Sequence, residues 1–135
     1  MAKRTYVDSC VLIAAWQGTD EIWKDAMAVL DDPERQFVVS HYLKLEVLPK
    51  PRFHRKETEV AFMEEFFARA DENIAPSAEI ADEAIELASR HDLAPVDALH
   101  ASMAKAAKAE LVTIEGETKP LFRVKDIKVV SLRTR

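Results

Sequence analysis

The chain reads Thr5-Tyr6-Val7-Asp8-Ser9-Cys10-Val11-Leu12-Ile13 near its N-terminus. Residues 5–7 are β-prone and predict a short strand, and residues 11–16 predict a helix that stops near Gly18. Asp8 directly follows the predicted strand. Because ligands of α/β sheets bind beyond the carboxyl ends of the strands, Asp8 lies where a functional side chain is expected.

The same alternation of strand and helix continues along the chain. Further strands are expected at residues 36–39, 73–75, 111–114 and 127–132, and helices at residues 20–30, 43–48, 56–70, 77–91 and 95–107. Ser40 and Ser77 are expected to be N-caps, and Pro49 and Pro51 to end the helix at 43–48. This pattern predicts an α/β fold, with a mostly parallel central sheet of about five strands and helices on both faces.

Length and composition restrict the class of protein. The chain has 135 residues, of which 48% are apolar, so a single domain over residues 1–135 is expected. Cys10 is the single cysteine, which excludes an intrachain disulfide and a cysteine-based zinc site and favours a reducing compartment. An early acid argues against a signal peptide, and no apolar run reaches the length of a membrane span. A soluble, cytoplasmic protein is therefore expected.

Charge alone argues against a nucleic-acid partner. The formal net charge is −5, whereas nucleic-acid-binding proteins usually carry a basic face. That objection weakens if many of the acids gather in one metal site. Two basic stretches contain Lys50, Arg52, His54, Arg55 and Lys56, and Lys119, Arg123, Lys125 and Lys128. On charge alone, the simplest interpretation of both is a solvated surface.

Four acids stand at positions that suit a shared site. Asp8 and Glu115 directly follow predicted strands, Glu46 lies in an apolar helical stretch, and Asp97 lies in the first turn of the helix that begins at Pro95. Carboxylates held close together repel one another and tend to protonate. Mg²⁺ or Mn²⁺ relieves this repulsion because hard dications prefer oxygen ligands. Such an ion can activate water and offset charge on a phosphodiester.

Each acid also has a purely structural interpretation. Asp8 can cap the following helix, and Asp97 can stabilise the positive end of its own helix. Glu46 can pair with Lys50, four residues further on. Glu115 can be an ordinary loop acid. Taken together, at successive crossovers of the sheet, the four acids favour a common site.

Four segments of the chain together resemble the PIN-domain family and, within it, the VapC-like toxins of toxin–antitoxin pairs. They are residues 5–13, residues 40–48, residues 93–101, and residues 111–115 followed by Phe122 and residues 127–132. The resemblance covers nearly the whole chain in order. It implies a PIN-like three-layer fold and a Mg²⁺- or Mn²⁺-dependent endoribonuclease that hydrolyses RNA. It further implies an antitoxin partner and a homodimer.

The resemblance also implies roles for single residues. Asp8, Glu46 and Asp97 correspond to metal-binding and catalytic acids of the family, and Glu115 to the acid of its closing motif. Ser9 and Thr113 correspond to residues that support such a site by hydrogen bonding.

Two positions depart from the family pattern. Cys10 replaces a polar Asn, so one contact near the metal is expected to be lost. Glu115 replaces Asp and carries one more methylene, a large change for a metal site. Glu117 is an alternative for that position.

Two further features have expected structural roles. His100 follows Asp97 by one helical turn and could face the site, but it is expected to pack or hydrogen-bond on the helix surface instead. The apolar stripe of the helix at 56–70 is expected to belong to the core. It consists of Val60, Met63, Phe66 and Phe67.

Two other functions compete with a metal-dependent ribonuclease. Cys10, Glu115 and the acidic net charge are compatible with a PIN-like binding module that is catalytically weak or inactive. An unrelated α/β phosphatase could use Asp8 as its nucleophile. That chemistry requires a second Asp two residues further on, where this chain has Cys10.

Overall fold

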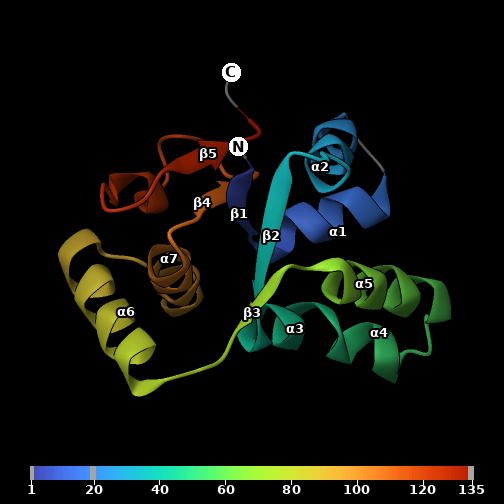
Figure 1. Cartoon of the computed structure of the whole chain (residues 1–135), viewed down its shortest axis with the longest axis horizontal. Helices are drawn as coiled ribbons and strands as arrows, with labels where there is room; N and C mark the ends of the chain where they lie inside the picture. Colours follow the sequence, from blue (N-terminus) through green and yellow to red (C-terminus); the bar gives the residue numbers. More distant parts are fainter. Residues whose placement is uncertain (1, 19–20, 134–135) are drawn as a thin grey trace.

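A parallel sheet lies at the centre of the computed structural model, which describes residues 2–18 and 21–133. Its strand order is β3-β2-β1-β4-β5 (Figure 1). The strands are β1 (Lys3–Val7), β2 (Arg35–Ser40), β3 (Glu72–Ile74), β4 (Glu110–Thr113) and β5 (Val129–Ser131). Val7 pairs with Val112, so the central strands β1 and β4 end side by side. The residues that follow these two strands therefore meet at one edge of the sheet.

Helices cover both faces of the sheet (Figure 1). They are α1 (Ser9–Gln17), α2 (Ile22–Leu30), α3 (His41–Val47), α4 (Pro49–Phe53), α5 (Glu57–Arg69), α6 (Ala78–His91) and α7 (Pro95–Ala107), with a short 3₁₀ helix, η1 (Pro120–Arg123). This arrangement confirms the predicted three-layer α/β fold. In the part of the chain that the structure describes, no helix is long and apolar enough to cross a membrane.

Alternation along the strands divides the core into two parts. Val7, Val39 and Val112 face one side, where they pack with residues of α1, α2, α3 and α5. Tyr6 and Leu111, their neighbours in sequence, face the other side and pack with α6 and α7. Successive side chains of a strand point to opposite faces, so a strand covered by helices on both sides is apolar throughout.

Helix ends follow the predicted signals closely. The Ser40 hydroxyl accepts a hydrogen bond from the Leu43 amide and caps α3, and Ser77 caps α6 in the same way. Gly18 ends α1 with a φ of 62°, a left-handed conformation that glycine adopts without strain. Both N-caps and the stop at Gly18 are therefore confirmed.

Three other expectations can be compared with the structure. Pro49 begins the short helix α4, because proline fits the first turn of a helix, so the chain stays helical past the predicted end. The apolar stripe of α5 contributes Met63 and Phe66 to the core, as expected. The helix expected from Asp20 is observed from Ile22, and Asp20 lies outside the described residues.

Candidate active site

Asp8 lies at the carboxyl edge of the sheet, between β1 and α1. Its amide donates a hydrogen bond to the Val112 carbonyl of β4 at 3.2 Å, and its carboxylate caps α1 by accepting from the Val11 amide at 3.4 Å. The capping role expected as the structural alternative is thus present. The side chain is buried, and this burial raises the pKa of the Asp8 carboxyl. Asp8 therefore caps a helix and is also a buried carboxyl group whose pKa is raised.

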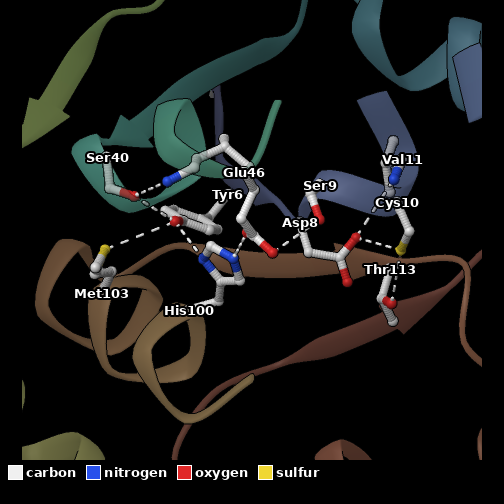
Figure 2. Close-up of polar contacts among 11 residues, drawn as sticks. Tyr6, Asp8, Ser9, Cys10, Val11, Ser40, Glu46, His100, Met103 and Thr113 are labelled. Carbon is white, nitrogen blue, oxygen red and sulfur yellow. Dashed lines mark hydrogen bonds and ion pairs between the residues drawn. The ribbon is translucent and has the colours of Figure 1, made fainter. Parts of the chain in front are cut away.

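Cys10 turns toward Asp8 rather than away from it. Its thiol donates a hydrogen bond to Oδ1 of Asp8, and its sulfur lies 3.6 Å from Oγ1 of Thr113 (Figure 2). At the position where the family usually has Asn, the thiol thus supplies a hydrogen bond of its own. Burial and the neighbouring Asp8 carboxylate raise the pKa of the thiol to about 12. Cys10 is thus a protonated donor at neutral pH.

Thr113 links the two central strands at the same edge. It is the last residue of β4 and is fully buried. Its hydroxyl accepts a hydrogen bond from the Glu115 amide at 3.1 Å, which fixes the turn after the strand. Hydrogen bonds from Cys10 and Thr113 also oppose the rise in the pKa of Asp8. Thr113 therefore contacts the Asp8 carboxyl region, and its supporting role at a metal site stays a prediction.

Glu46 reaches the site from α3. Its Oε2 accepts a hydrogen bond from the Ser9 hydroxyl at 3.2 Å, and its Oε1 lies 2.5 Å from Nε2 of His100 (Figure 2). The side chain is 28% exposed. Among the described residues, Glu46 forms no ion pair with Lys50, so the structural alternative expected for it is absent. Ser9 thus contacts one of the candidate metal ligands, and its supporting role stays a prediction.

Asp97 and Glu115 are the other two candidate acids of the site. Asp97 lies in the first turn of α7, and Glu115 follows β4; both are partly buried. Within residues 2–18 and 21–133, neither carboxylate forms a hydrogen bond or an ion pair. Burial raises the pKa of Asp97, and the charges of Asp8 and Glu46 raise it further. Burial likewise raises the pKa of Glu115, with contributions from Asp97 and Asp8.

These mutual effects show that the fold brings the four predicted acids into one electrostatic environment. The four side chains offer carboxylate oxygens, which are the ligands that a hard dication prefers. Their charges repel one another, and a bound dication would offset this repulsion. Among the described side chains, no three His, Cys, Asp or Glu residues form a preformed metal-binding group. Asp8 and Glu46 are held by hydrogen bonds within the protein. Binding a metal beside these two would therefore require the side chains of Asp97 and Glu115 to rotate toward them.

Two residues near the site were not identified from the sequence as its members. His100 is 1% exposed and contacts Glu46, so the expectation that it stays on the helix surface is wrong. The reason is that α7 is buried on most of its circumference, between the sheet and α6. The hydroxyl of Tyr6 lies 2.6 Å from Nδ1 of His100. The sequence signals were the one-turn spacing of His100 from Asp97 and a tyrosine two residues before Asp8.

The fold and its acidic edge define a parallel α/β protein with a carboxylate site beyond the central strands. The chain belongs to the PIN-domain family, because the model of the PIN domain matches residues 5–118. The predicted family is thereby confirmed, and the alternative of an unrelated phosphatase is wrong. No curated protein sequence matches the chain at a significant level.

Several solved structures share the fold. VapBC2 from Rickettsia felis, bound to a DNA fragment from its promoter, matches with a TM-score of 0.73 and 19% identity over 95% of this chain and 98% of that chain. A toxin–antitoxin complex from Klebsiella pneumoniae matches at 0.72 and 21% identity, over 97% and 99% of the two chains. VapBC-1 from nontypeable Haemophilus influenzae matches at 0.71 and 18%, over 97% and 99%. At these identities the likeness is one of fold.

Proposed function

We propose that the chain is a Mg²⁺- or Mn²⁺-dependent endoribonuclease and the toxin of a toxin–antitoxin pair. One observation carries this proposal: the PIN fold gathers Asp8, Glu46, Asp97 and Glu115 at one edge of its sheet, where their charges raise the pKa of neighbouring carboxyls. An acidic cluster with two unpartnered carboxylates favours binding of a dication. Glu46 comes from α3, and Asp8 directly follows β1. Asp97 and Glu115 are the remaining two of the four proposed metal ligands.

In the proposed hydrolysis of RNA, the metal ion and the side chains of the protein have different roles. When bound, Mg²⁺ or Mn²⁺ would act as a Lewis acid toward the phosphodiester and would help a water molecule to ionise. The carboxylates of the chain hold the ion, and without it their negative charge repels the RNA phosphates. Ser9 orients Glu46, and Cys10 orients Asp8, through the hydrogen bonds described above. Cleavage should therefore require both the acids and the ion.

An exposed basic segment supports RNA as the substrate. Residues 52–56 and Lys50 are exposed, and Arg52 alone of them pairs with an acid, Glu64, at 3.0 Å; among the described residues, the remaining cations of this segment form no ion pair. The ring of Phe53 in the same segment is 81% exposed. Unpaired cations bind phosphates, and an exposed aromatic ring can stack on an unpaired base. The segment directly follows α3, which carries Glu46.

We further propose an antitoxin and a second copy of the chain as protein partners, and the cytoplasm as the location. The structural neighbours named above are described as VapBC or toxin–antitoxin complexes. Apolar side chains that remain exposed on helices can take part in such contacts: Leu45, Ile85 and Val96. The free thiol of Cys10 is compatible with a reducing compartment.

Cleavage of a mixed, structured RNA tests the proposal. Purified protein is incubated with Mn²⁺ or Mg²⁺, with EDTA, and in parallel as the Asp8→Asn variant. We expect internal cleavage with either ion and loss of cleavage in both controls. Cleavage that survives Asp8→Asn would contradict a role for Asp8 and indicate a contaminating nuclease.

A binding module without catalysis is the second candidate function. Two observations favour it. Among the described residues, no three side chains are already arranged to hold a metal ion. In addition, Glu115 stands in place of the usual Asp. This function predicts RNA binding without cleavage in the presence of Mn²⁺. Cleavage that is lost on Asp97→Asn would exclude it.

A further inference from the structure

A buried chain of hydrogen bonds leaves α3 at its N-cap and returns to it at Glu46. The Ser40 hydroxyl, which caps α3, lies 2.7 Å from the hydroxyl of Tyr6 on β1. The Tyr6 hydroxyl lies 2.6 Å from Nδ1 of His100 on α7, and Nε2 of His100 lies 2.5 Å from Oε1 of Glu46 (Figure 2). We propose that Tyr6 and His100 position the Glu46 carboxylate for metal binding, an inference that rests on the proposed function.

The donors and acceptors of this chain fit one direction. The Ser40 oxygen accepts from the Leu43 amide at 3.1 Å, so its own proton is free to go to Tyr6. A tyrosine hydroxyl is protonated at neutral pH, so Tyr6 can donate its proton to Nδ1 of His100. An imidazole whose Nδ1 accepts a hydrogen bond carries its proton on Nε2, where it points to Glu46. In this arrangement every donor along the chain has an acceptor.

Burial makes this chain of hydrogen bonds rigid. Ser40, Tyr6 and His100 are all almost completely inaccessible to solvent. A buried polar group that loses its partner cannot turn to water, so breaking one bond leaves an unsatisfied buried group, which is unfavourable. The His100 ring is thus held by Tyr6 on one side and offers a fixed donor on the other. The sulfur of Met103, which is also on α7, lies 3.6 Å from the Tyr6 hydroxyl.

Glu46 needs such support more than Asp8 or Asp97. It stands on α3, a seven-residue helix, and its longer side chain has more rotatable bonds than that of Asp8 or Asp97. Its two oxygens are held separately, one by His100 and the other by Ser9. Ligands of a metal site must be held to about 0.5 Å. Tyr6 and His100 are positioning residues in this scheme, since they reach the site only through Glu46.

A purely structural role for His100 must be distinguished from this one. The rings of Tyr6 and His100 are 5.2 Å apart between centroids, so the imidazole also contributes packing. A matched pair of variants separates the two roles. In His100→Gln the amide nitrogen can take the place of Nε2 and still donate to Glu46. In His100→Asn the shorter amide takes the place of Nδ1, keeps a partner for Tyr6 and loses Glu46, and both variants remove the ring.

The test is Mn²⁺ binding by the metal-free protein, measured by calorimetry, with thermal unfolding of the same samples. Loss of a residue that orients a ligand usually weakens metal binding about 10- to 100-fold, which we expect for His100→Asn. We expect His100→Gln to stay within about threefold of the wild type. Tyr6→Phe, which keeps its ring, should weaken binding by at least about threefold, because Nδ1 of His100 loses its hydrogen-bond donor.

Ser102→Ala is the control, because Ser102 is equally buried on α7 but donates to the Ile80 carbonyl, outside the chain of bonds. Equal losses in both His100 variants would overturn the inference in favour of packing, as would unchanged affinity in His100→Asn. If His100→Asn does not fold, unchanged affinity in Tyr6→Phe overturns it. A wild-type protein that binds no Mn²⁺ would contradict the proposed function as well, whereas wild-type binding with unaffected variants contradicts this inference alone.

Discussion

His100 and Glu46 are in contact through Nε2 and Oε1, at 2.5 Å, although 54 positions separate them in the sequence. The contact joins α7 to α3 across the carboxyl end of the sheet. Asp97 begins the same helix, α7, that carries His100. One helix thus provides a candidate metal ligand and the residue that holds another. Changes in the packing of α7 should therefore affect both sides of the site together.

Glu115, rather than Glu117, is predicted to complete the set of ligands. Glu115 is partly buried and its pKa is raised by burial, Asp97 and Asp8, whereas Glu117 is exposed. We expect Glu115→Gln to weaken Mn²⁺ binding by at least about 10-fold, as measured by calorimetry. Glu117→Gln is the matched control and should leave the affinity unchanged. The reverse result would assign the position to Glu117.

Cys10 is predicted to react slowly with alkylating reagents. Its thiol pKa is raised to about 12 by burial and by the Asp8 carboxylate, and only the thiolate is nucleophilic. In native protein near pH 8, about one thiol in ten thousand is then ionised. We expect iodoacetamide to modify Cys10 far more slowly than in urea-unfolded protein, as followed by mass spectrometry. Asp8→Asn should accelerate the native reaction, because it removes the negative charge; an unchanged rate would show that burial alone controls the thiol.

The stability of the metal-free protein should depend on pH through Asp97. A raised carboxyl pKa means that the folded state keeps a proton that the unfolded state has already lost, so the contribution to stability falls as pH rises. The fall begins near the ordinary pKa of Asp, about 4, and is complete above the raised pKa. We therefore expect metal-free Asp97→Asn to melt a few degrees higher than the wild type at neutral pH. Near pH 4 this difference should disappear.

Circular dichroism across this pH range measures the effect. The difference between the two proteins isolates Asp97 from groups with the opposite behaviour, such as Asp126, whose pKa is lowered by its hydrogen bond with Lys105. Adding Mn²⁺ should stabilise the wild type more than Asp97→Asn, because the cation offsets the repulsion between Asp97 and the neighbouring carboxylates. A lower melting temperature for metal-free Asp97→Asn at neutral pH would contradict repulsion at this site.

The strands and most helix ends could be predicted because they depend on local signals. Ser40 and Ser77 cap the helices that they were expected to cap, and Asp8 follows β1 as predicted. The order β3-β2-β1-β4-β5 places the ends of β1 and β4 together, which is why acids distant in sequence come to share one edge. Membership of the PIN-domain family followed from the same ordered segments.

The hydrogen-bond chain could not be predicted in the same way. Tyr6 and His100 are 94 positions apart, and periodicity states which face a residue occupies but not which polar atoms meet there. The surface position expected for His100 assumed an exposed side of α7, yet this helix is buried on most of its circumference. The prediction for Cys10 considered only the contact that Asn would make at this position. It did not foresee the hydrogen bond from the thiol to Asp8. Such contacts depend on tertiary packing.

The basic segment after α3 is predicted to hold the RNA backbone. Lys50, Arg55 and Lys56 are exposed and, among the described residues, form no ion pair, so each is available to a phosphate. Changing all three to Gln should weaken RNA binding to a similar degree for every sequence. Each lost contact with single-stranded RNA should also reduce the salt dependence of log K by about 0.7, hence about 2 for three contacts.

Fluorescence anisotropy with labelled RNA measures both quantities, in an Asp8→Asn background that keeps the RNA intact. The control removes the same number of charges elsewhere, by changing Lys3, Lys24 and Lys128 to Gln, all of which are exposed. An equal loss in the control would mean that overall charge, rather than this segment, governs binding. Phe53→Ala adds an independent measure: stacking on an aromatic ring contributes about 1–3 kcal/mol per base. Its loss should weaken binding without changing the salt dependence, because no charge is removed.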